Sequence, residues 1–161
     1  MEKRSVQSGV PGILRPFREY LTGLGLVEGD QVVYIGVPGT CTPFVELLAF
    51  ATRSLPVTQI FVPGVDESGA RRLEPVPKVG MQPAGPADTL HPRVIVVMGG
   101  LAMDNSGVEV EQVLAFLDRY PTAQLAGVCF QKMFEKAGWC ERVPFEFMID
   151  AAIDPVEVWS D

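Results

Sequence analysis

The chain has 161 residues and a formal net charge of −7, with 47% hydrophobic and 20% charged residues. This length predicts one domain spanning residues 1–161, and the hydrophobic content excludes a chain that is disordered throughout. Because the acidic residues outnumber the basic ones, nucleic acid and anionic membranes are disfavoured as partners.

Cysteine usage and the N-terminal sequence indicate a cytoplasmic protein. Cys41, Cys129 and Cys140 are an odd number of cysteines without close spacing, which is typical of reduced thiols. Residues 1–9 are polar and lack the apolar core of a signal peptide, and no apolar run approaches the roughly 20 residues of a membrane span. We therefore expect a soluble cytoplasmic protein in which residues 1–10 are flexible. Assembly into a homo-oligomer is left open.

Hydrophobic periodicity predicts helices and strands that alternate along the chain. Apolar residues at helical spacing predict a first helix between Gly12 and Gly25, with Pro16 in its first turn. Apolar runs rich in β-branched residues predict buried strands at residues 31–37, 58–62, 93–98, 124–130 and 145–149. Further helices are expected at 43–53, at 106–120 after a capping box of Ser106 and Glu109, and at 131–139.

Residues 64–92 interrupt this alternation with five prolines and predict an irregular excursion, in which VPKVGMQ forms a short strand or one arm of a hairpin. The rest of the pattern predicts a three-layer α/β/α fold, either Rossmann-like or flavodoxin-like, with a mainly parallel sheet of about five strands. Ligands of such folds bind at the carboxyl ends of the strands. Three segments are expected to meet at that edge, namely residues 36–42, 99–103 and 129–132.

A small anionic ligand is one interpretation of that edge. Small and hydroxyl residues precede a predicted helix start, where free amides and the helix dipole favour an anion. Gly99 and Gly100 allow a close backbone approach and oxyanion-type donors. The candidate ligand-binding residues are Gly39, Thr40, Cys41, Thr42, Gly99, Gly100, Leu101 and Phe130. The alternative is structural, with Gly39 making a turn, Thr42 capping the helix and the glycine pair forming a tight connection.

Thiol catalysis is a second interpretation. Cys129 ends a predicted strand just before a helix, as in a nucleophile elbow, and helix N-termini lower the pKa of cysteines. Cys129 and Cys41 are therefore the candidate catalytic residues, expected within about 10 Å of each other at one sheet edge. The alternative for Cys129 is a small thiol that fills the core.

Other site classes have weaker support. The chain lacks GxxxxGK[ST], and GxGxxG is absent after the first strand, which excludes a P-loop and disfavours dinucleotide binding through Asp66 or Glu67. No CxxC or HxxxH spacing supports a metal site, so no metal ligand and no cofactor are assigned. An interaction role is suggested by the acidic segment IDPVEVWSD, although Trp159 is expected to pack on its own core.

Two resemblances add to these patterns. The stretch RVIVVMGGLAM…GVCFQKMFEKAGW, residues 93–139, resembles the core of the class I glutamine amidotransferase and DJ-1/PfpI superfamily. That resemblance implies a nucleophilic role for Cys129 and oxyanion donors near Gly99 to Leu101 and at Phe130. The chain departs from this pattern because Gln131 stands where those enzymes usually have a histidine, and His91 is the only histidine.

Over nearly the whole chain, the motifs PGTCTPF, VGMQ, VMGGLAM, GVCFQKMFEKAGW and IDPVEVW resemble an uncharacterised family of small proteins from methanogenic archaea. This resemblance implies an archaeal cytosolic protein and assigns no activity. Binding of a small anionic metabolite or nucleotide is therefore the first expectation. A cysteine-dependent acyl transfer or redox enzyme and a structural or interaction protein are the alternatives.

Overall fold

The structure is a computed structural model that describes residues 1–3 and 5–161. Its centre is a seven-stranded sheet in the order β4-β3-β2-β1-β5-β6-β7. The strands are β1 (Gln31–Gly36), β2 (Thr58–Pro63), β3 (Arg71–Val76), β4 (Gly80–Pro86), β5 (Pro92–Met98), β6 (Gln124–Phe130) and β7 (Phe147–Ala151). β2, β1, β5, β6 and β7 are parallel, and β3 and β4 are antiparallel.

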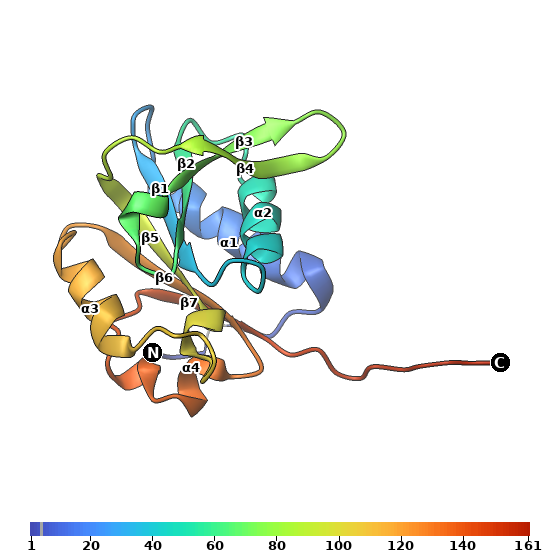
Figure 1. The fold of residues 1–161 in the computed structure, drawn as a ribbon. Coiled ribbons are helices and arrows are strands. Elements are labelled where there is room, and N and C mark those ends of the chain that lie inside the picture. The colour runs from blue at the N-terminus through green and yellow to red at the C-terminus, as the bar shows by residue number, and fades with distance from the viewer. Residues whose placement is uncertain (4) are drawn as a thin grey trace.

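Helices cover both faces of this sheet (Figure 1). The helices are α1 (Gly9–Gly23), α2 (Thr42–Ala51), α3 (Val110–Asp118) and α4 (Met133–Lys136). α1 and α2 pack on one face with Val32 and Tyr34 of β1. α3 and α4 pack on the other face with Val33 and Ile35, because side chains alternate along a strand. Burial on both faces explains the continuous apolar run of β1.

The α/β class and the mainly parallel sheet are confirmed, but the expected count of about five strands is too low. The additional pair is the hairpin of β3 and β4, which occupies most of the predicted irregular excursion. Pro83 and Pro86 lie in β4, an edge strand, where a missing N–H is tolerated. Lys78 takes a left-handed conformation (φ 64°) in the turn between the two strands.

Helix ends differ locally from the sequence expectations. α1 starts at Gly9, which places Pro16 inside the helix. The expected flexibility of residues 1–10 stays a prediction, and Arg4 lies outside the described residues. The capping box of α3 is formed by Glu109 and Gln112, because Ser106 instead bonds the Leu101 carbonyl. Among the described residues, no helix combines the length and apolarity needed to cross a membrane.

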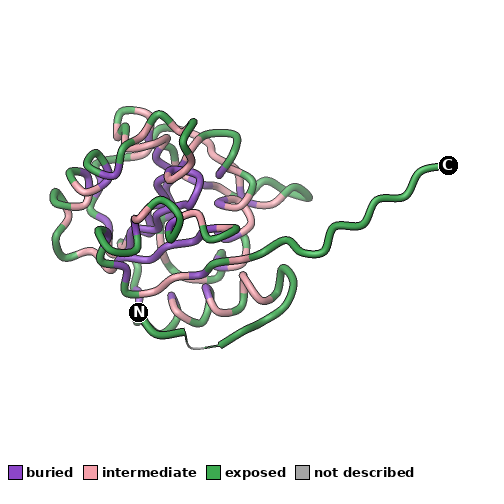
Figure 2. Tube along the Cα trace, turned by 90° about the horizontal axis from the view of Figure 1, so that it is seen from below, coloured by how far each residue is buried: buried purple, intermediate pink, exposed green. Residues whose placement is uncertain are grey.

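The C-terminal residues 152–161 extend away from the rest of the chain (Figure 1), and Figure 2 shows them exposed along their length. Trp159 is 82% exposed, so the expectation that it packs on its own core is wrong. Ile153, Val156 and Val158 are exposed as well. We call residues 152–161 the C-terminal segment.

Candidate functional site

Three loops meet at the carboxyl edge of the parallel strands. They follow β1, β5 and β6, which are neighbours in the sheet. The chain leaves β1 toward α2 on one face and leaves β5 toward α3 on the other. β1 and β5 therefore define a topological switch point, where open α/β sheets form a crevice.

A crevice of about 170 Å³ opens at this switch point. Its lining residues are Thr40, Cys41, Phe44, Met98, Gly99, Gly100, Val128, Phe130, Met133 and Ile153. The rings of Phe44 and Phe130 contact each other, with centroids 4.3 Å apart and planes tilted by 40°. An apolar cavity of roughly this volume is large enough to bind benzene. The crevice thus offers space for an apolar group the size of one aromatic ring.

Five of the eight predicted ligand-binding residues line this crevice, namely Thr40, Cys41, Gly99, Gly100 and Phe130. Gly39, Thr42 and Leu101 do not. Gly39 is exposed and donates its amide to Oγ1 of Thr42 at 3.1 Å. Leu101 is fully buried in the core beside α3.

Some backbone amides of the loop after β1 already donate hydrogen bonds within that loop. The Cys41 amide donates to the Val37 carbonyl at 2.8 Å, and the Gly39 amide is held by Thr42. Two amides of the expected anion site are thus occupied by the protein itself. The predicted capping role of Thr42 is also wrong, since α2 begins at Thr42 and its N-cap residue is Cys41.

The glycine pair after β5 allows the loops to pack closely. A Cβ on Gly100 would lie 2.5 Å from Sγ of Cys41, and a Cβ on Gly99 would lie 2.7 Å from Cα of Cys129. The two cysteines therefore flank the pair. Cys41 belongs to the core beside α1 and α2, and Cys129 belongs to the core beside α3 and α4. They share an edge of the sheet and approach the glycine pair from opposite faces, and their expected separation within about 10 Å stays a prediction.

Cys129 lacks the environment of an activated nucleophile. Its side chain is 1% exposed, and Sγ donates to Oδ1 of Asp150 at 3.2 Å. Burial, with a further contribution from the Asp150 carboxylate, raises the pKa of Cys129 to about 12. Burial also raises the pKa of Cys41. Both pKa values are raised rather than lowered as expected for helix N-termini, because burial penalises the charged thiolate.

The strained turn after β6 lies beyond Cys129. Gln131 and Lys132 have left-handed conformations, with φ of 55° and 58°, and the Lys132 amide donates to Oδ1 of Asp150 at 2.9 Å. An elbow nucleophile would occupy such a turn. Cys129 instead lies inside the strand, so its expected elbow geometry is wrong.

Among the described residues, neither a histidine nor a metal cluster accompanies the two thiols. The ring nitrogens of His91 lie 3.1 Å from the Thr89 carbonyl and 3.2 Å from the Gly29 carbonyl. These residues are near the starts of β1 and β5, opposite to the crevice. Within residues 1–3 and 5–161, no three histidine, cysteine or acidic side chains gather in a way that would hold a metal ion.

Thiol labelling should reflect this burial. At neutral pH, a maleimide is expected to modify the exposed Cys140 and to leave Cys41 and Cys129 unmodified in the folded chain. Peptide mass spectrometry measures each site, and Cys140→Ser provides a chain with no rapidly labelled thiol. Rapid modification of Cys129 in the native state would contradict the assignment of this thiol to the core.

Half of the residues that line the crevice were not predicted from the sequence. Phe44, Met98, Val128, Met133 and Ile153 are apolar and were indistinguishable from core residues. The positions of Phe44 and Met133 could have identified them as lining residues, because each lies in the first turn of a helix that follows a parallel strand. A large apolar side chain at that position faces the carboxyl edge of the sheet.

The fold and the crevice define a doubly wound α/β protein with an apolar site at its switch point. The chain belongs to an archaeal family described as "Uncharacterized protein conserved in archaea (DUF2124)", whose model matches residues 8–154. An uncharacterised protein from Methanothermobacter thermautotrophicus is 35% identical over 96% of both chains. Another from Methanocaldococcus jannaschii is 31% identical over 91% of this chain and 88% of its own length.

A solved structure supports the same fold. The crystal structure of a protein of unknown function from Methanothermobacter thermautotrophicus matches with a TM-score of 0.86 and 33% identity. The match covers 99% of both chains. These comparisons establish the family and the fold.

Proposed function

We propose that this protein binds a small molecule by inserting an apolar ring or chain into the switch-point crevice. The observation that carries the proposal is the apolar lining at the topological switch point, where doubly wound sheets bind their ligands. Without the antiparallel hairpin, the parallel strands follow the order 2-1-3-4-5, which is flavodoxin-like and binds ligands beside strands 1 and 3.

The lining indicates which part of the ligand enters. Phe44 and Phe130 offer aromatic surface, and Met98 and Met133 offer flexible thioethers that adapt to planar groups. A crevice of about 170 Å³ is smaller than the roughly 300 Å³ at the lower end of drug-sized sites. We therefore expect it to hold one ring or a short chain, with the remainder of the ligand outside.

A polar or anionic group of the same ligand would lie at Thr40, beside the start of α2. α2 has ten residues, and its N-terminal dipole favours negative charge there. An anionic metabolite with an aromatic part, such as a nucleotide, meets both requirements. The amides of Gly39 and Cys41 already donate hydrogen bonds within the protein. The apolar part of the ligand therefore supplies most of the binding affinity, and its anionic group supplies a smaller share.

Catalysis by Cys129 is the alternative that the geometry favours less. Its thiol is neutral at physiological pH and donates to Asp150, which leaves no thiolate to attack a substrate. Its side chain also belongs to the core beside α3 and α4, whereas the crevice opens beside Phe44 of α2. Noncovalent binding requires neither a thiolate nor a cysteine side chain that faces the crevice.

A ligand titration followed by methyl NMR tests the proposal. Indole and phenyl phosphate are expected to shift the methyl resonances of Met98 and Met133, because an aromatic ring would lie against both side chains. Inorganic phosphate alone should leave these resonances unchanged. Binding of inorganic phosphate with equal affinity, or no shift with either aromatic probe at saturating concentration, would overturn the proposal.

A matched pair of substitutions localises the site. Ile153→Trp places a larger side chain over the crevice and should weaken indole binding at least about tenfold by occupying its volume. Val156→Trp makes a similar change three residues further along, at an exposed position that does not line the crevice. The second variant should bind indole as the unmodified chain does.

A further inference from the structure

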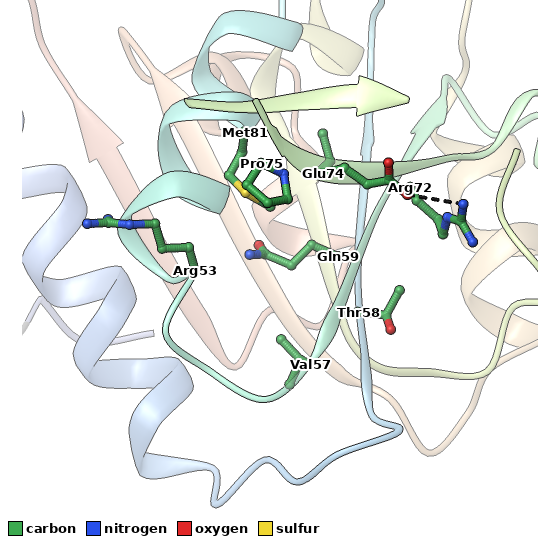
Figure 3. Close-up of a pocket in the computed structure, with 9 residues that line it drawn as sticks. Arg53, Val57, Thr58, Gln59, Arg72, Glu74, Pro75 and Met81 are labelled. Carbon is green, nitrogen blue, oxygen red and sulfur yellow. Dashed lines mark ion pairs between the residues drawn. The ribbon is translucent and has the colours of Figure 1, made fainter. Parts of the chain in front are cut away.

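A second depression lies at the other end of the sheet, between α2 and the hairpin of β3 and β4. It has a volume of about 380 Å³ and is lined by Arg53, Val57, Thr58, Gln59, Arg72, Leu73, Glu74, Pro75 and Met81. We call it the arginine groove. Figure 3 shows Arg53 and Arg72 at opposite ends of the groove, with Val57, Gln59, Pro75 and Met81 between them. The groove therefore has a partly apolar centre and a cation at each end, with the Glu74 carboxylate paired to Arg72.

Among the described residues, most polar groups of the groove have hydrogen-bond or ion-pair partners, but one buried donor does not. Gln59, in its floor, donates to the Ala49 carbonyl and accepts from the Tyr34 hydroxyl at 2.7 Å. Arg72 pairs with Glu74 through Nη2 at 3.0 Å, but its buried Nε has no hydrogen-bond partner in the part of the chain that the structure describes. A buried donor without an acceptor is unfavourable. If the Arg72 side chain turned outward, an acceptor brought by another molecule would satisfy this Nε.

The C-terminal segment has the complementary pattern. In an extended chain, residues at alternate positions share one face, which places Glu157, Trp159 and Asp161 together. That face presents an acid, an aromatic ring and a second acid. Trp159 is 82% exposed, although tryptophan usually buries much of its large apolar surface. The two acids of this face suit the two arginines at the ends of the groove, where they would replace Glu74 at Arg72 and the Phe50 carbonyl at Arg53.

To reach this groove, the segment of the same chain would have to be fully extended along a path that the helices block. β7 ends four strands away from β2 and at the opposite end of the parallel strands, which separates Ala151 from the groove by about 30 Å. A straight path between them crosses the sheet face that α1 and α2 cover. Eight extended residues bring Trp159 at most about 29 Å from Ala151. A second copy of the chain is therefore the occupant that the geometry allows.

We propose that the chain forms a two-fold dimer in which each C-terminal segment binds in the arginine groove of the other copy. Trp159 packs against Met81 and Pro75 of the second copy, and the carboxylates of Glu157 and Asp161 face Arg53 and Arg72. One carboxylate oxygen accepts from Nε of Arg72. Two reciprocal contacts close the assembly, as in most symmetric dimers. This inference concerns a different surface from the crevice and does not depend on ligand binding.

Analytical ultracentrifugation of the full chain tests the dimer. The unmodified chain should sediment with twice its mass of 17.5 kDa as concentration rises. Trp159→Ala should weaken dimerisation about 30-fold or more, as expected for a central tryptophan. Val158→Ala, on the opposite face of the segment, should change dimerisation less than about twofold. A monomer at all concentrations, a dimer that Trp159→Ala leaves intact, or open-ended polymers would each overturn the proposal.

An exchange of charge tests the pairing itself. Arg53→Glu with Arg72→Glu makes the groove acidic, and Glu157→Lys with Asp161→Lys makes the segment basic. Each double variant should fail to dimerise alone, whereas an equimolar mixture should form a heterodimer. Circular dichroism checks that the groove variant is folded, and the segment variant alters only exposed positions. Failure of two folded variants to form the heterodimer would reject the proposed ion pairs.

Discussion

Replacing Gly99 by alanine is expected to lower the free energy of unfolding by about 3 kcal/mol. A Cβ at this position would lie 2.7 Å from Cα of Cys129 and closer still to its Cβ. These atoms belong to the backbone and side-chain base of β6, so they move only if the strand moves. Urea unfolding followed by circular dichroism measures the change.

Gly23→Ala is the matched control for this substitution. Gly23 lies in the last turn of α1, and a Cβ there would meet no atom within 4 Å. Because alanine has the higher helix propensity, this variant should be unchanged or more stable by up to about 1 kcal/mol. Equal stability of the two variants would contradict the close packing of β5 and β6 at the crevice.

The free energy of unfolding is expected to decrease markedly at alkaline pH. The pKa of Cys129 rises from its ordinary value of 9.0 to about 12 in the folded chain, with burial as the largest cause. Between these values the unfolded chain releases a proton that the folded chain retains, so stability falls as pH rises. At 1.36 kcal/mol per pKa unit, this thiol removes up to about 3 kcal/mol between pH 9 and pH 11.

Comparison of variants isolates this thiol from the tyrosines with raised pKa values, such as Tyr120. Cys129→Ala should show a shallower decline in the free energy of unfolding over the same pH range. Cys140→Ala removes an exposed thiol instead and should nearly reproduce the pH dependence of the unmodified chain. An identical slope for Cys129→Ala and the unmodified chain would show that Cys129 titrates normally.

The parallel strands were predictable because burial on both faces leaves a clear signal. The apolar run Gln124–Phe130 was predicted with the bounds that the structure gives. The hairpin of β3 and β4 was predicted only in part, as a short strand or hairpin arm at residues 76–82. Prolines normally indicate irregular structure, and only the edge position of β4 makes Pro83 and Pro86 acceptable. Edge position depends on strand order, which a single sequence does not specify.

The location of the candidate site was predictable, and its chemistry was not. The rule that ligands bind at carboxyl ends placed Thr40, Gly99 and Phe130 at the crevice. An anion site was favoured because the backbone amides after β1 were expected to be free. In the structure, local hydrogen bonds such as that from the Cys41 amide to the Val37 carbonyl occupy some of these amides. The buried orientation of Cys129 depends on which face of β6 meets α4, and strand alternation alone does not fix that choice.

The most direct test of the binding proposal is a crystal structure of the full chain grown with saturating indole. Electron density for the ring is predicted beside Phe44 and Phe130, in contact with Met133 and beneath Ile153. A crevice closed by the side chains of the protein itself, or indole bound only elsewhere on the surface, would contradict the proposed function.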